Sequence, residues 1–141
     1  MRKPLTIADY PLAETRSADI RGARGKSLDE ITLEAVVAGA VTMADLRITP
    51  QALRDQAEIA RAAHRDTLAL NFERAAELVD VPQDVIMAAY ELLRPGRAKA
   101  AAELLDLAET FRVTYQAPQI AAYFSEAAEI YTRRGMFVTR F

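Results

Sequence analysis

Few side chains in this sequence of 141 residues could perform chemistry. It has one histidine, His64, and no cysteine, which excludes disulfides, thiolate metal sites and a cysteine nucleophile. Carboxylates recur at helical spacing, as at Glu73 and Glu77. A di-iron bundle, however, needs Glu-x-x-His on two helices, and Arg61 stands three residues before the only histidine. We therefore interpret the carboxylates as a solvated helix face.

Phosphate-binding loops, nucleic-acid sites and membrane spans are also unsupported. The five glycines match neither G-x-G-x-x-G nor the P-loop pattern. With 18 Lys and Arg against 20 Asp and Glu, the overall charge attracts neither nucleic acid nor an anionic membrane. No apolar run is long enough to cross a bilayer, and the first residues lack the apolar stretch of a signal peptide. We therefore expect a cytoplasmic protein.

Residues 1–28 differ from the rest of the chain. Six cations and three anions give them a net charge of +3, whereas the remaining residues carry 12 cations and 17 anions. Because this segment contains prolines and glycines and no sustained apolar period, it is predicted to be an extended arm. Its apolar anchors need another surface to cover them, and they are Leu5, Ile7, Tyr10 and Leu12.

From Ser27 onward the pattern predicts helices and no strands, which indicates an all-α fold. A capping box formed by Ser27 and Glu30 and a terminal Gly39 predict a first short helix, and Thr42 could cap another turn. Thr49 followed by Pro50 marks a further start, because proline suits the first helical position.

One long helix, or two nearly in line, is predicted from Pro50 to about Val79, where no other Pro or Gly interrupts the apolar period. His64 falls on the apolar side of this prediction. A lone histidine there is more often a packed or interface residue than a ligand, and we interpret His64 in this way.

The remaining helices are predicted from their boundary signals. Val81-Pro82 begins one that ends at Arg94-Pro95-Gly96, and two more cover residues 97–115 and 118–134, with Gly135 as the stop. We therefore expect an arm (1–28), a helical domain (29–134) and an apolar C-terminal tail (135–141).

The last 18 residues hold more large apolar side chains than one helix stripe needs: Phe124, Tyr131, Met136, Phe137, Val138 and Phe141. Exposed patches of this kind on a small protein usually mark a partner interface. From the residues alone, the expectation is a soluble helical interaction subunit.

Several runs of the sequence carry a more specific signal. They include Asp9-Tyr10-Pro11-Leu12-Ala13, Arg47-Ile48-Thr49-Pro50, the run N-F-E-R-A-A-E-L over residues 71–78, and L-R-P-x-R ending at Arg97. Together they resemble the small subunit of adenosylcobalamin-dependent diol and glycerol dehydratases, and the resemblance covers about residues 9–134. Gly96 and the apolar tail depart from the family pattern.

The resemblance implies a complex of large, medium and small subunits arranged as a dimer of heterotrimers. That complex converts 1,2-propanediol or glycerol to the aldehyde and water by a radical mechanism. The substrate site and its metal cation are implied for the large subunit, and adenosylcobalamin is implied between the large and medium subunits. No catalytic, cofactor-binding or metal-binding residue is implied for the small subunit, so the isolated chain is expected to be inactive.

The arm is expected to lie on the large subunit, and a stretch of the long predicted helix is expected to help hold the chain in place. The predicted interface residues are Asp9, Tyr10, Pro11, Leu12, Asn71, Phe72 and Arg74. Each has a structural alternative: a hydrogen bond within the bundle for Asn71, a core position for Phe72, and a salt link to Glu77 or a neighbouring helix for Arg74.

Two rival interpretations stay open at this stage. One is a free-standing helical adaptor or DNA-associated regulator that uses the charge of the arm, and the other is a complete enzyme. The sequence also leaves open the choice between propanediol and glycerol, because the discriminating pocket is implied for another chain. Encapsulation in a microcompartment is open as well, since Asp9-Tyr10-Pro11 follows closely on the first residue without a longer leader.

Overall fold

The computed structural model describes residues 2–137 and confirms the all-α fold, with no strand among them. The chain forms two compact units, Met1–Val79 and Asp80–Phe141, and each has its own apolar core. The division into arm, helical domain and tail stays a prediction.

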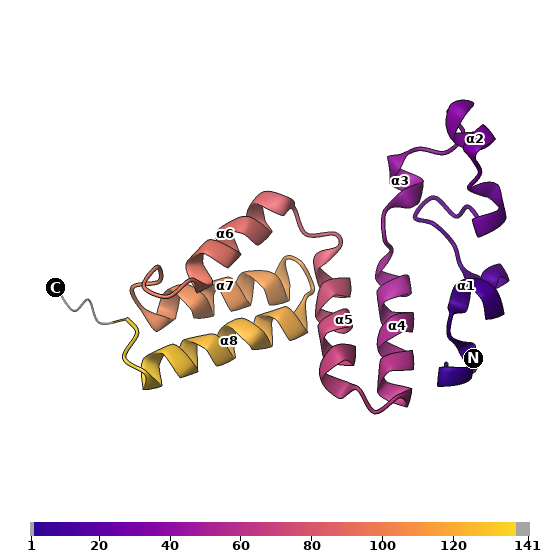
Figure 1. The fold of residues 1–141 in the computed structure, drawn as a ribbon. Coiled ribbons are helices and arrows are strands. Elements are labelled where there is room, and N and C mark those ends of the chain that lie inside the picture. The colour runs from indigo at the N-terminus through magenta and orange to yellow at the C-terminus, as the bar shows by residue number, and fades with distance from the viewer. Residues whose placement is uncertain (1, 138–141) are drawn as a thin grey trace. The chain divides into compact units, whose positions relative to one another are not determined.

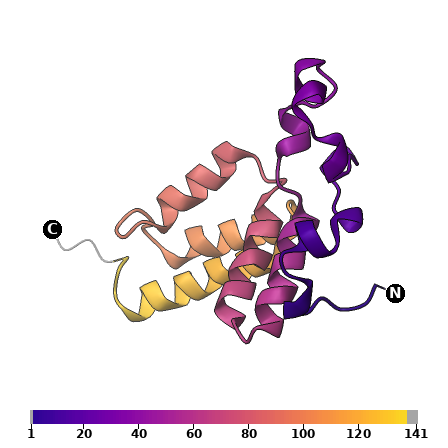
Figure 2. The same ribbon diagram turned by 45° about the vertical axis from the view of Figure 1, so that its right-hand side comes forward.

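In the first unit, α4 (Pro50–Ala62) and α5 (Asp66–Leu78) form a helical hairpin and lie side by side (Figures 1 and 2). The prediction of one long helix, or two nearly in line, is therefore wrong. The chain reverses at residues 63–65, where His64 has a φ of +58°. His64 is exposed in this turn, so its predicted place on the apolar side of a helix is wrong too.

Small side chains let the two helices of this hairpin pack closely. Ala57 and Ala60 of α4 and Ala69 of α5 are buried together, and Phe72 packs against them. The start of α4 agrees with the prediction, because the Thr49 hydroxyl accepts a hydrogen bond from the amide of Ala52 at 3.1 Å. The N-terminal segment of the unit packs against α4 of this hairpin.

The N-terminal segment is anchored on α4. Leu5 and Leu12 are buried with Ile59, and Ile20 packs against the three. Short helical turns interrupt the predicted extended arm: Ile7–Asp9, α1 (Leu12–Thr15) and Ser17–Asp19. Two of the four predicted anchors are thus covered within this chain. The other two are Ile7, 58% exposed, and Tyr10, 61% exposed.

Between this segment and the hairpin lie a 3-10 turn (Leu28–Glu30), α2 (Leu33–Val37) and α3 (Met43–Leu46). The predicted capping box of Ser27 is present but closes only the 3-10 turn, whereas Thr32 caps α2. Thr42 caps α3 as predicted.

The second unit contains α6 (Gln83–Leu93), α7 (Ala101–Val113) and α8 (Pro118–Arg133), of which α7 and α8 lie side by side (Figures 1 and 2). Phe111, fully buried, meets Phe124 edge to face with ring centroids 4.9 Å apart.

The hydroxyl of Tyr131 in α8 donates a hydrogen bond to the carbonyl of Leu93 in α6. Phe137 packs near the Tyr131 ring, with centroids 6.0 Å apart, so this part of the apolar tail covers its own unit. Gly135 has a φ of +62° and ends α8 as predicted. The predicted tail residues Val138 and Phe141 lie outside the described residues.

Candidate functional site

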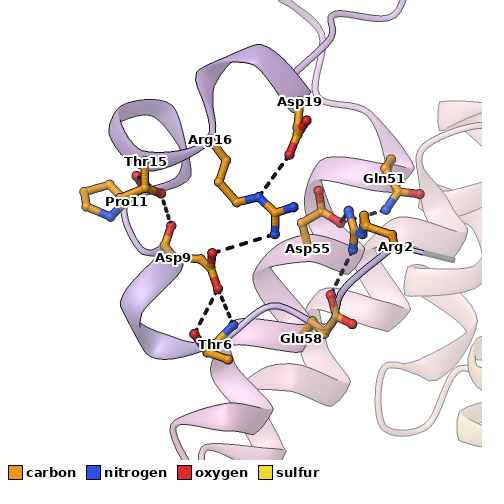
Figure 3. Close-up of polar contacts among 10 residues, drawn as sticks. All are labelled: Arg2, Thr6, Asp9, Pro11, Thr15, Arg16, Asp19, Gln51, Asp55 and Glu58. Atoms are coloured by element: carbon orange, nitrogen blue, oxygen red, sulfur yellow. Dashed lines mark hydrogen bonds and ion pairs between the residues drawn. The ribbon is translucent and has the colours of Figure 1, made fainter.

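Asp9, a predicted contact residue, belongs to a local hydrogen-bond network (Figure 3). Its carboxylate accepts hydrogen bonds from the Thr6 amide at 2.8 Å and from the Thr6 hydroxyl at 2.9 Å. Arg16 lies 3.7 Å from Asp9 and donates to Asp19 at 2.9 Å. The Thr6 amide, above all, holds the pKa of Asp9 below its ordinary value. Asp9 therefore fixes the conformation of its own segment.

A second set of polar contacts fastens the start of the chain to α4 (Figure 3). The Arg2 guanidinium pairs with Asp55 at 2.8 Å and with Glu58 at 2.9 Å. Gln51 donates to the Asp55 carboxylate at 2.7 Å. The pKa of Arg2 is raised above its ordinary value, first by the hydrogen bond with Asp55 and then by the charges of Asp55 and Glu58. The N-terminal segment and α4 are thus joined by both apolar and ionic contacts.

Tyr10, Pro11 and Leu12 differ in what they can offer to a partner. Leu12 is buried against Leu5 and Ile59, so it contributes to the core of its unit. Tyr10 and Pro11 are exposed and joined by a cis peptide bond. Tyr10 is therefore the accessible aromatic side chain of this motif.

The other predicted contact residues lie on α5. Asn71 is exposed, whereas Arg74 and Phe72 are half-buried. Phe72 packs in the hairpin core, which agrees with the structural alternative for this position. On the same helix, Glu73 accepts from Arg61 of α4 at 2.7 Å and helps to hold the hairpin together. A contact of Asn71 or Arg74 with another subunit stays a prediction.

Sequence reasoning missed a group of exposed apolar residues between α4 and the N-terminal segment. Of the 15 large apolar residues that are exposed in residues 2–137, seven fall between residues 28 and 48. They are Leu28, Leu33, Val36, Val37, Met43, Leu46 and Ile48, and we call them the apolar face. The i, i+3, i+4 spacing of Leu33, Val36 and Val37 carries the signal, but the same spacing is typical of a helix face that packs inside its own chain.

An ion pair between the half-exposed Arg24 and the buried Asp45 of α3 joins the segment before this face to α3. The Asp45 side chain is 0% exposed, and its Oδ2 atom lies 3.2 Å from the Arg24 guanidinium. Asp45 also accepts a hydrogen bond from the Thr42 amide at 2.8 Å, and Arg24 donates to the Thr42 hydroxyl at 3.1 Å. Gly22 lies so close that a Cβ there would sit 2.9 Å from the Asp45 carbonyl oxygen. We call this arrangement the Arg24–Asp45 clamp.

Two further features concern the described residues: clusters of metal-ligating side chains and helices that could span a membrane. No group of three or more His, Cys, Asp or Glu side chains among residues 2–137 is placed to hold a metal ion. The only histidine of the sequence, His64, is exposed in the α4–α5 turn. In the same residues, no helix has both the length and the apolar composition to cross a membrane. Among the described residues, the candidate functional features are the exposed apolar face and the Arg24–Asp45 clamp.

Comparison with known proteins identifies the family of this chain. A family described as "Dehydratase small subunit" matches residues 5–137. The chain belongs to the dehydratase small-subunit family. The propanediol dehydratase small subunit of Citrobacter freundii is 48% identical over 128 residues, which cover 91% of this chain and 74% of the relative. The protein of the same name from Salmonella typhimurium is also 48% identical over 128 residues, which cover 91% of this chain and 73% of that relative.

The predicted membership of the dehydratase small-subunit family, inferred from the runs N-F-E-R-A-A-E-L and L-R-P-x-R, is confirmed. The match begins at residue 5, so it includes the N-terminal segment that packs on α4 as well as both helical units. The family model thus spans the Arg24–Asp45 clamp and the apolar face.

Proposed function

We propose that this chain is the structural, non-catalytic small subunit of an adenosylcobalamin-dependent dehydratase that converts 1,2-propanediol or glycerol to the aldehyde and water. The family match over residues 5–137 carries the proposal. It is supported by the lack of a metal-binding group among the described residues and by the exposed position of the only histidine. When the cofactor carries the difficult chemistry, a companion subunit needs no reactive side chains.

The proposed partners are the large and medium subunits of the same enzyme, in a dimer of heterotrimers. Adenosylcobalamin and the substrate would be bound by those partners. The contribution of this chain would be to complete the assembly through exposed residues such as Tyr10 and Asn71, with the polar network of Asp9 fixing the segment that carries Tyr10. We expect this assembly to be located in the cytoplasm.

The arrangement of charges argues against the rival proposal of a nucleic-acid-binding arm. Three of the six cations in residues 1–28 are paired with acids of this chain: Arg2 with Asp55 and Glu58, Arg16 with Asp9 and Asp19, and Arg24 with Asp45. A guanidinium already engaged in this way contributes less to binding phosphate. The +3 charge of the arm therefore overstates its attraction for nucleic acid.

Co-purification tests the proposal. The chain should be expressed with the large and medium dehydratase subunits, and a second preparation should omit it. We expect the chain to elute in the complex and cobalamin-dependent aldehyde formation to fall when it is left out. A chain that elutes apart from the other subunits, with unchanged aldehyde formation in its absence, would overturn the proposal. Salt-sensitive binding of DNA by the purified chain would support the rival.

A further inference from the structure

The stretch that contains α2 is ordered without a single buried side chain. None of residues 28–40 is buried, and only Ile31 and Ala35 are half-buried. In both views this stretch extends beyond the N-terminal end of α4 (Figures 1 and 2). We call residues 28–40 the strap. Burial of apolar surface therefore contributes little to keeping the strap in place.

The hydrogen bonds that order the strap join residues close in sequence. The Ser27 amide donates to the Glu30 carboxylate at 2.7 Å, and the Ala35 amide donates to the Thr32 hydroxyl at 3.2 Å. The amide of Ala40 donates to the carbonyl of Ala35 at 2.9 Å. α2 has five residues, whereas isolated helices need about 12 to 15 residues even in favourable sequences. These local bonds shape the strap, but they do not fasten it to the rest of its unit.

The Arg24–Asp45 clamp joins the two ends of the strap. Arg24 precedes the strap and Asp45 follows it, and the two side chains approach to 3.2 Å. Arg24 also donates to the Thr42 hydroxyl at 3.1 Å. The backbone closes at the same place, because a Cβ at Gly22 would sit 2.9 Å from the Asp45 carbonyl oxygen. Val41, directly after the strap, is buried, so packing resumes where the strap ends.

The α4–α5 hairpin is held in a different way. Its buried residues Ala57, Ala60 and Ala69 pack with Phe72, and none of them belongs to the strap or to the clamp. Loss of the clamp can therefore release the strap without exposing the core of the hairpin. Segments with few buried apolar contacts open at a lower free energy than the whole fold.

We propose that the strap opens as one cooperative unit while the α4–α5 hairpin stays folded, and that the Arg24–Asp45 clamp is the contact that keeps it closed. The strap carries three residues of the apolar face on α2: Leu33, Val36 and Val37. The clamp therefore controls how this part of the apolar face is presented. This conformational device goes beyond the proposed function, which assigns no moving part to the chain.

Native-state amide exchange of the full chain tests whether the strap is one unit. The strap is followed at the amides of Val36, Ala38 and Ala40, which donate to the carbonyls of Thr32, Glu34 and Ala35. The hairpin is followed at interior amides of α4. In the wild-type chain we expect the three strap amides to share one protection factor, within about threefold, that is at least about tenfold lower than that of α4. Strap amides whose protection factors differ by more than about tenfold would show separate fraying and overturn the cooperative unit.

Variants test the clamp and the independence of the strap. Arg24→Met should accelerate exchange of the strap amides about thirtyfold, because it leaves the buried Asp45 carboxylate without its cation. Arg24→Lys retains the charge and gives up the hydrogen bond to Thr42, so it should accelerate exchange by a smaller factor, about three- to tenfold. Arg112→Met, which breaks an exposed pair on α7, is the control and should leave the strap amides within about twofold.

Ala69→Gly weakens the hairpin and leaves the clamp intact. Ala69 is fully buried in α5, and glycine in a helix interior costs about a factor of five in the folding equilibrium. We therefore expect the interior amides of α4 to exchange about fivefold faster in this variant, with the strap amides unchanged.

Two results would overturn the proposal. Strap amides that exchange at the wild-type rate in both Arg24 variants would show that the clamp does not hold the strap. Strap amides that Ala69→Gly accelerates as much as those of α4 would show that the strap opens only when the whole unit unfolds. Because the full chain is measured by itself, either result leaves the proposed subunit function standing.

Discussion

Replacing Arg24 by Met tests whether burial, instead of distance, sets the strength of an ion pair in this protein. The Arg24 side chain is 49% exposed, and its partner Asp45 is 0% exposed at 3.2 Å. Arg112 is also 49% exposed and approaches Glu109 more closely, at 2.6 Å, but Glu109 is 60% exposed. Distance alone would make the Arg112 pair the stronger one. Arg112→Met is therefore a matched control for Arg24→Met.

Removal of Arg24 leaves the buried Asp45 carboxylate without its cation. A buried acceptor that loses its partner costs about 1–3 kcal/mol, and the half-exposure of the guanidinium keeps the expected cost near the middle of this range, about 2 kcal/mol. Exposed i, i+3 pairs such as that of Arg112 contribute about 0.5 kcal/mol or less. We expect the free energy of unfolding to fall by about 2 kcal/mol in Arg24→Met and by no more than about 0.5 kcal/mol in Arg112→Met.

Two measurements check this expectation. Urea unfolding followed by circular dichroism gives the change in the free energy of unfolding. Amide exchange of Thr42, whose N–H donates to Asp45 at 2.8 Å, reports on the clamp itself. A loss of about 2 kcal/mol should accelerate that exchange about thirtyfold, if it occurs through opening of the clamp. Equal losses in the two variants, or unchanged exchange of Thr42 in Arg24→Met, would refute the reasoning.

Three further outcomes are expected. The pKa of Asp9 is lowered below its ordinary 3.8, first by the Thr6 amide, so its contribution to folding is present above about pH 4 and is lost as the pH falls through the lowered value. Amide exchange of Thr6 should therefore accelerate in that acid range, and an Asp9→Asn variant in which the same acid-induced change persists would contradict this assignment. Tyr131→Phe removes the hydrogen bond to the Leu93 carbonyl and should reduce the free energy of unfolding by about 1 kcal/mol; urea unfolding identical to wild type would show that the bond contributes nothing. His64→Gly should raise the free energy of unfolding by about 0.5–1 kcal/mol, because His64 has a left-handed φ of +58°. A His64→Ala control should not raise it, and a glycine variant less stable than wild type would argue against strain in this turn.

Local signals in the sequence predicted several helix ends, although α7 begins at Ala101 and not at residue 97 as predicted. Thr49 with Pro50, Arg94-Pro95-Gly96 and Gly135 each act through the backbone conformation of neighbouring residues, so their effect does not depend on the tertiary fold. The α4–α5 turn could not be predicted in this way. His64 adopts a left-handed conformation without a Gly or Pro to mark it, and the apolar period continues through the turn.

The candidate site was harder to predict because spacing does not distinguish a core face from an interface face. Leu33, Val36 and Val37 have the same helical spacing whether they pack inside the chain or wait for a partner. The Arg24–Asp45 clamp joins residues that are far apart in the sequence, and no local pattern marks such a pair. Only the fold shows that helix caps and the Arg24–Asp45 pair help to order α2 and α3 while their apolar side chains remain exposed.

Titration of the large and medium dehydratase subunits with this purified chain is the most direct test of its role as a structural subunit. Adenosylcobalamin and 1,2-propanediol are supplied in excess, and aldehyde formation is measured at each ratio of subunits. We predict a rate that rises to a plateau as the chain saturates its partners, and no aldehyde from the chain alone. A flat titration, or aldehyde produced by the chain without the other subunits, would contradict the account.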